Sequence, residues 1–134
     1  AQESRGLGDV YKRQDEGGAL SAFGVNFNQD GKKLEKLLSY KTLGLPLDLL
    51  LTEKILPEVP KMIKIDVDGI EHLILLGAKK TLKDSKCKTV LIEINEKFKE
   101  QASESEKILT ECGFSLKEKY HAVEETYNQI WFKD

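Results

Sequence analysis

Three charged side chains recur at every second position near the middle of the sequence, a spacing that could support chemistry. Lys64, Asp66 and Asp68 alternate with apolar residues in M-I-K-I-D-V-D-G, residues 62–69, and a helical pattern follows at once. A strand that stops at Gly69 before a helix would carry these charges to one edge of a sheet. Because buried charges are costly unless they are paired or used, we expect the functional site here.

The elements that must position these side chains alternate between strand and helix. Apolar residues recur at helical spacing over residues 70–82, which predicts an amphipathic helix. Residues 89–95, T-V-L-I-E-I-N, are typical of a buried strand that ends in Glu93 and Asn95. A capping box at Ser-Glu-Ser-Glu predicts a further helix over residues 103–112.

Shorter elements are predicted around this unit. We expect a strand over 22–27, a turn over 28–31, a short helix over 47–56, and antiparallel strands over 114–121 and 129–133. The resulting order is strand, helix, strand, helix, strand, strand. This alternation predicts an α/β fold, in which a mostly parallel sheet has helices on both faces and binds ligands at the carboxyl ends of its strands.

Composition limits the classes of function. The chain has 134 residues, which suits one domain, and a net charge of -2, which gives no reason to expect nucleic acid or an anionic membrane as a partner. No apolar stretch approaches the roughly 18 residues of a membrane span. Cys87 and Cys112 lack metal-ligand spacing and indicate reduced thiols. We therefore expect a cytoplasmic protein without a metal site.

The first residues have a different origin in our interpretation. Residues 4–14, S-R-G-L-G-D-V-Y-K-R-Q, resemble the translation of a sequencing adapter. We therefore expect residues 1–14 to be an artefact that is disordered or packs without purpose. The natural domain would then be residues 15–134, a truncated domain whose true N-terminus is missing.

The central stretch resembles the FkbM family of S-adenosylmethionine-dependent methyltransferases. That family carries K-I-D-V-E-G-x-E followed by an apolar helix with Gly-Ala near its end. Lys64, Asp66, Gly69 and Glu71 match the motif, whereas Asp68 stands where the family usually has Glu. Weaker similarity extends to the upstream L-D-L-L, to V-L-I-E-I-N and to the final aromatic strand I-W-F.

The resemblance implies a class I methyltransferase fold. This is a Rossmann-like, three-layer, seven-stranded sheet, mostly parallel, with an antiparallel terminal hairpin, of which this chain would be the C-terminal part. The cofactor would be S-adenosylmethionine, and the reaction O-methylation of a small-molecule or glycan hydroxyl. The first strand and the glycine-rich cofactor loop have no counterpart here, so the cofactor-binding residues stay unknown and we expect the chain to be inactive alone.

The resemblance also implies catalytic roles for three residues. In the family fold the end of this strand faces the methyl group, so Asp66 would act as a base or orient the acceptor hydroxyl. Lys64 would orient Asp66 or contact the acceptor. Glu71 is included because of the family match. The competing interpretations are a structural ion pair between Lys64 and Asp66, and a solvated charge at Glu71.

Three further residues are candidates for substrate binding. Asp68 either binds the substrate or caps the helix that follows. Glu93 and Asn95 either line the acceptor pocket or make hydrogen bonds at the end of their strand.

A different class of enzyme shares part of the pattern. Phosphohydrolases of the haloacid dehalogenase type carry an apolar strand that ends in D-x-D-G. In such an enzyme Asp66 would be the nucleophile, Asp68 the acid/base and Mg²⁺ the cofactor. Two observations oppose this hypothesis. In such phosphohydrolases the motif stands at the start of the domain, and it is followed by Thr or Val, whereas here Ile-Glu follows it. A metal-dependent sugar-nucleotide transferase and a non-enzymatic binding domain are two weaker hypotheses.

Overall fold

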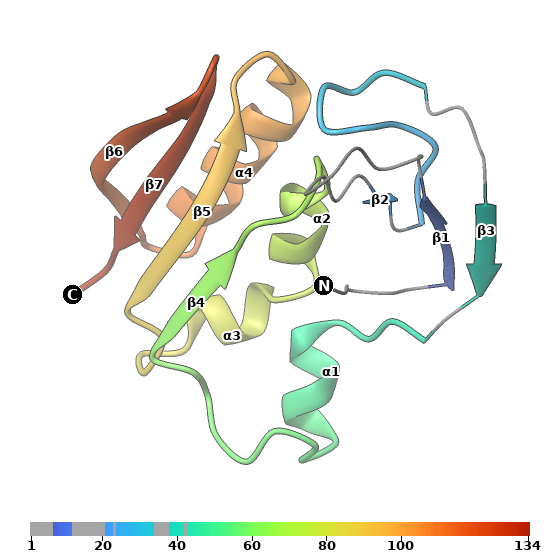
Figure 1. Cartoon of the computed structure of the whole chain (residues 1–134). Coiled ribbons are helices and arrows are strands. Elements are labelled where there is room, and N and C mark those ends of the chain that lie inside the picture. Colours follow the sequence, from blue (N-terminus) through green and yellow to red (C-terminus); the bar gives the residue numbers. More distant parts are fainter. Residues whose placement is uncertain (1–6, 12–20, 23, 34–37, 42) are drawn as a thin grey trace.

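The computed structural model describes residues 7–11, 21–22, 24–33, 38–41 and 43–134. In chain order its elements are β1 (Leu7–Tyr11), β2 (Ser21–Ala22), β3 (Leu38–Lys41), α1 (Leu47–Thr52), β4 (Met62–Ile65), α2 (Glu71–Leu76), α3 (Lys79–Lys83), β5 (Thr89–Asn95), α4 (Lys99–Glu111), β6 (Ser115–Val123) and β7 (Thr126–Phe132). Two sheets lie side by side (Figure 1), one in the order β2-β1-β3 and the other in the order β4-β5-β7-β6.

The four-stranded sheet confirms the α/β class and the antiparallel terminal hairpin. β4 pairs in parallel with β5, whereas β7 runs antiparallel to both β5 and β6. The prediction of a mostly parallel sheet is wrong, because β7 lies between β5 and β6 and runs antiparallel to both. The short link after Val123 makes β7 return antiparallel beside β6, and β7 also pairs antiparallel with β5, so the β4–β5 pair is the parallel one in this sheet.

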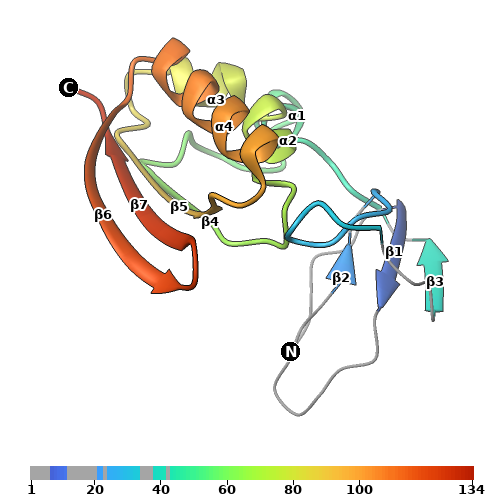
Figure 2. The same ribbon diagram turned by 90° about the horizontal axis from the view of Figure 1, so that it is seen from above.

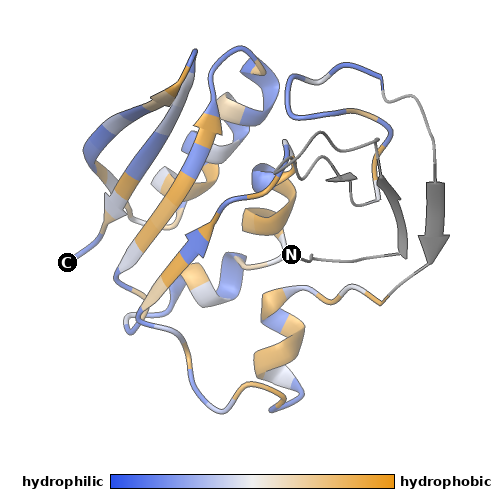
Figure 3. Cartoon of the chain, viewed as in Figure 1, coloured by the Kyte–Doolittle hydropathy of each residue, from blue (hydrophilic) through white to orange (hydrophobic). Residues whose placement is uncertain are grey.

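The helices α1 to α4 cover one face of this sheet (Figure 2), so the described residues form two layers and not the predicted three. Alternation along β5 places Val90, Ile92 and Ile94 towards the helices, where they pack with Leu75 and Trp131. Figure 3 shows β5 as hydrophobic along most of its length and β6 as mostly hydrophilic. The core therefore lies between β4, β5 and β7 and the helical layer.

The predicted helix over residues 70–82 is interrupted. α2 ends at Leu76 and α3 begins at Lys79, with Gly77 between them. A Cβ at Gly77 would lie 3.0 Å from Cβ of Pro46, so α1 approaches closely at the break. The helical period continues through the interruption, and this is why the pattern predicted one helix.

The helix predicted over 103–112 begins earlier, at Lys99. The residues of the capping-box pattern lie inside α4, and one of them, Ser105, is buried. Phe98 precedes the helix and packs edge-to-face against Phe27, with ring centroids 5.4 Å apart. Tertiary packing thus sets this helix start.

The N-terminal strands form a small sheet of their own. β1 lies within residues 1–14, which were expected to be disordered or to pack without purpose, and it pairs antiparallel with β2 and β3. β3 is the second edge strand of this sheet. The predicted turn over residues 28–31 is confirmed by the hydrogen bond from Gly31 N to Asn28 O, 2.9 Å long. The strand predicted over 22–27 is limited to β2 and an isolated bridge at Phe27, and residue 23 lies outside the described residues.

Within the described ranges, none of the helices combines the length and the apolar character needed to cross a membrane.

Candidate active site

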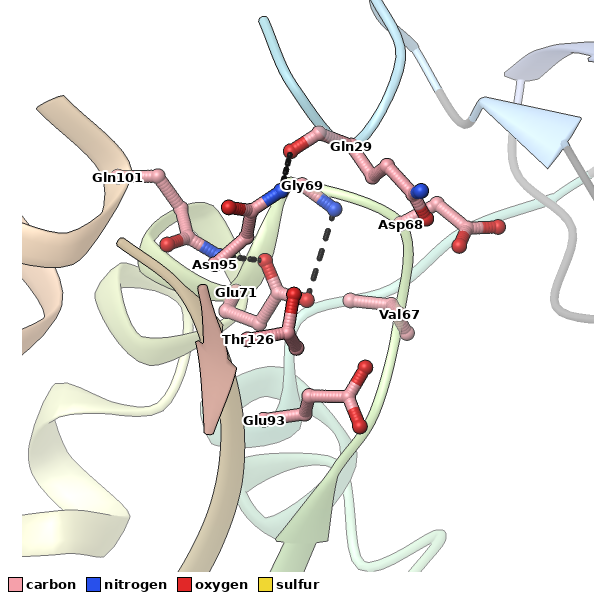
Figure 4. A pocket seen from close by; sticks show the side chains of 9 residues that line it. All are labelled: Gln29, Val67, Asp68, Gly69, Glu71, Glu93, Asn95, Gln101 and Thr126. Atoms are coloured by element: carbon pink, nitrogen blue, oxygen red, sulfur yellow. Dashed lines mark hydrogen bonds between the residues drawn. The ribbon is translucent and has the colours of Figure 1, made fainter. Parts of the chain in front are cut away.

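A polar pocket lies where β4 and β5 reach their carboxyl ends (Figure 4). It has about 260 Å³ of empty space, part of which is open to solvent. The residues that line it are Gln29, Val67, Asp68, Gly69, Glu71, Glu93, Asn95, Gln101 and Thr126.

Gly69 allows the chain to turn from β4 into α2 beneath the 28–31 turn. Its φ of +91° lies in the region that side chains rarely adopt, and a Cβ there would lie 3.0 Å from Cα of Gln29. The Cβ would also lie 3.1 Å from the carbonyl oxygen of Asn28. The sequence therefore needs glycine at this position for two reasons, the backbone angle and the close approach of a second segment.

Glu71 is the buried carboxyl group of the pocket, with 2% of its surface exposed. Gln101 Nε2 donates a hydrogen bond to its Oε2, and the Gly69 N–H lies 3.5 Å from its Oε1. Burial raises the pKa of Glu71 to about 7, although hydrogen bonds from Gln101 and from the backbone oppose the rise. The group can therefore gain or lose a proton near neutral pH.

Asn95, at the end of β5, forms hydrogen bonds that hold the 28–31 turn against the pocket. Its Nδ2 donates to Asp30 Oδ1 at 2.9 Å and to the carbonyl oxygen of Gln29 at 3.2 Å. The Asn28 side chain also holds this turn, because its Oδ1 accepts from the N–H groups of Asp30 and Lys32. The turn and β5 together thus form one wall of the pocket.

Glu93 lies two residues before Asn95 and is half-buried. Burial raises the pKa of its carboxyl, and the negative charge of Asp66 adds to the rise, while Lys64 opposes it. Lys64 Nζ and Asp66 Oδ2 form an ion pair 2.6 Å long, and both side chains are exposed. This pair is not among the pocket-lining residues, yet it acts on the pocket through Glu93.

The structure brings four of the six predicted site residues into one pocket, namely Asp68, Glu71, Glu93 and Asn95. Lys64 and Asp66 lie outside it. The hypothesis of a solvated charge at Glu71 is wrong, because α2 turns this side chain inwards against α4.

The capping role considered for Asp68 stays a prediction. The N-cap residue of α2 is Ile70, which makes no side-chain capping hydrogen bond. Asp68 lines the pocket.

Sequence reasoning missed Gln29, Gln101 and Thr126. These residues come from a turn, from α4 and from the start of β7, and nothing in their local sequence indicates a shared site. The one signal in the sequence was the predicted turn over residues 28–31.

Metal chemistry gains no support in the part of the chain that the structure describes. There, no group of three or more His, Cys, Asp or Glu side chains is placed to hold a metal ion. The hypothesis of a Mg²⁺-dependent phosphohydrolase at Asp66 and Asp68 therefore has no observation in its favour.

Comparison with known proteins gives one match. The family model described as "Methyltransferase FkbM domain" matches residues 13–116, which is most of the chain and includes all six predicted site residues. Neither the curated proteins nor the solved structures contain a match to this sequence.

Proposed function

Since the chain belongs to the FkbM methyltransferase domain family, we propose that its acidic pocket is part of a methyl-transfer site. The methyl donor would be S-adenosylmethionine, and the acceptor a hydroxyl group of a small molecule or a sugar. The observation that carries this proposal is the family match over residues 13–116, within which the pocket residues from Gln29 to Gln101 fall.

The lining residues fit the cofactor in charge but not in size. S-adenosylmethionine carries positive charge at its sulfonium and amino groups, and Asp68, Glu71 and Glu93 line the pocket with carboxyl groups. The 260 Å³ of empty space includes open solvent, so the pocket as described would take at most one polar end of the cofactor or of the acceptor, and not both molecules together. When bound, the cofactor would supply an electrophilic methyl group. The fold we propose for the complete site is the class I methyltransferase fold.

Within this site we propose Glu71 as the group that takes the proton of the acceptor hydroxyl. A general base works best when its pKa lies near the working pH, and burial brings the pKa of Glu71 to about 7. Asp66 was the first candidate for this role from the sequence. Its exposed ion pair with Lys64 favours a supporting role for both, in which they set the charge around Glu93.

Chemical-shift mapping tests the proposal on the whole chain. Addition of S-adenosylmethionine at millimolar concentration should shift the amide resonances of Gly69, Asn95 and Thr126. The variant Glu93→Gln should weaken this binding several-fold, because it removes a carboxylate that faces a cation. Glu58→Gln, a change at an exposed acid that does not line the pocket, should not.

The outcomes are distinct. If no pocket resonance moves, or if only resonances outside the pocket move, the proposed site is wrong. Tight, micromolar binding would support the site and would contradict the prediction that the main cofactor loop has no counterpart in this chain.

A further inference from the structure

Gln101 is a buried amide whose one hydrogen bond points at the pocket carboxyl group. It lies on α4, 30 residues from Glu71 in sequence, and 1% of its surface is exposed. Its Nε2 donates to Glu71 Oε2, while its Oε1 has no hydrogen-bond partner among the described residues. Burying an amide is costly when it is only half satisfied, so packing alone does not account for glutamine here.

We propose that Gln101 is the positioning residue of the pocket, which holds Oε2 of Glu71 so that Oε1, which has only a long contact of 3.5 Å with the Gly69 N–H, can exchange a proton with a bound hydroxyl. Figure 4 shows the two oxygens of Glu71 in different surroundings, one towards Gln101 and the other towards the Gly69 N–H and the lining residues. The assignment of a proton-accepting role rests on the proposed function; the pairing of Gln101 with Glu71 does not.

A primary amide suits this position in both protonation states of the carboxyl group. Its N–H donates to a carboxylate, and its carbonyl oxygen accepts from a carboxylic acid. Because Oε1 of Gln101 has no other partner in the described structure, a half-turn of the amide breaks no second hydrogen bond. When the hydroxyl O–H bond breaks, the proton goes to Glu71, and the amide keeps the carboxyl group in place.

The charged residues around the pocket do not stabilise the Glu71 carboxylate, so Gln101 is the side chain that does. Asp68 and Glu93 line the same pocket, and none of the described residues that line it is Lys, Arg or His. His72, next to Glu71 on α2, has its pKa lowered by burial, against the opposing charges of Glu100 and Glu104 on α4. A neutral donor is therefore what stabilises the carboxylate form, together with backbone N–H groups.

The first test uses the unmodified protein and NMR spectroscopy. The Nε2 resonances of Gln101 should change with pH at the same midpoint as the carboxyl carbon of Glu71, assigned with Glu71→Gln. Gln129 serves as the control, since it is a buried glutamine whose Oε1 accepts from Trp131 Nε1 at 2.9 Å and which does not line the pocket. Gln101 resonances that ignore the Glu71 midpoint would overturn the proposal.

The second test removes the donor. Gln101→Met has a similar shape without the amide and should raise the Glu71 midpoint by about one pH unit or more, since a hydrogen bond to the charged form is lost. Gln129→Met should leave that midpoint unchanged. An unchanged midpoint in folded Gln101→Met would contradict the proposal, and if this variant does not fold, the measurement on the unmodified protein decides alone.

Neither test involves the cofactor, so the two proposals can fail separately. A coupled Gln101–Glu71 titration without binding of S-adenosylmethionine would retain the pairing and remove the methyl-transfer site. Cofactor binding without the coupled titration would retain the methyl-transfer site and remove the pairing of Gln101 with Glu71.

Discussion

At the scale of single residues, Glu71 shows a conflict between burial and charge. The family motif places an acid at the start of α2, where the helix dipole favours a negative charge, but the fold turns it away from water. Gln101 and the backbone satisfy the carboxyl group only in part, so its proton is held more tightly than in water. Such strongly shifted groups concentrate at functional sites.

The pH dependence of stability follows from this shift. The folded state holds the Glu71 proton up to about pH 7, whereas the unfolded chain releases it near 4.5. The contribution of this group to the free energy of unfolding is therefore greatest below pH 4.5 and falls by about 3 kcal/mol as the pH rises through 7. In Glu71→Gln this fall should disappear.

Urea unfolding at a series of pH values measures the effect. Relative to the unmodified protein, Glu71→Gln should gain stability steadily between about pH 4.5 and pH 7, and the gain should level off above that range. Glu58→Gln, at an exposed position, is the control for a general loss of one acid. A difference between Glu71→Gln and the unmodified protein that does not depend on pH would show that Glu71 titrates normally in the folded state.

At the scale of elements, an acidic side chain of α1 caps the N-terminus of α3. Asp48 of α1 accepts hydrogen bonds from Lys80 N at 2.9 Å, from Thr81 N at 2.8 Å and from Thr81 Oγ1 at 2.7 Å. Burial raises the pKa of Asp48, but the hydrogen bonds from Thr81 and Lys80 outweigh it, so the pKa is lowered. This contact makes the break at Gly77 possible, because the open N-terminus of α3 has an acceptor for its N–H groups.

The variant Asp48→Ala should therefore destabilise the protein by about 1–2 kcal/mol at neutral pH, the usual cost of losing a helix cap. The effect should shrink as the pH falls below about 4, since the lowered pKa means that protonation removes the stabilising carboxylate. Urea unfolding with Glu58→Ala as the matched control measures both. If Asp48→Ala and Glu58→Ala have equal effects, the contact does not stabilise α3.

At the scale of the whole molecule, the hydrophobic core lies on one side of the main sheet. Leu75 and Leu82 are fully buried between the helices and β5. On the other face Met62 is 65% exposed. The outer strand β6 is exposed at all nine positions, and its register with β7 shifts at two places. Charged side chains on an edge strand oppose pairing with another chain.

This one-sided core predicts an asymmetry between leucine variants. Leu75→Ala should lower the free energy of unfolding by about 2–5 kcal/mol, because it leaves a cavity in the core. Leu116→Ala, on β6 with 45% of its surface exposed, should cost about 1 kcal/mol or less. Equal losses in urea unfolding would indicate that a further layer covers the outer face in solution.

The sequence by itself determined the local features. Its periodicities placed β4, β5 and the terminal hairpin, and its motif identified the family and the strand end around Gly69. These features can be predicted because a strand, a turn or a motif depends on neighbouring residues.

Only the tertiary structure decided which charges share a site. It left the Lys64–Asp66 pair in solvent, buried Glu71 against Gln101, and added Gln29 from a distant turn. It also placed all the described helices on one face and let Asp48 cap a separate helix. The physical reason is that burial, and with it the pKa of a carboxyl group, depends on contacts between segments many residues apart, which periodicity cannot record.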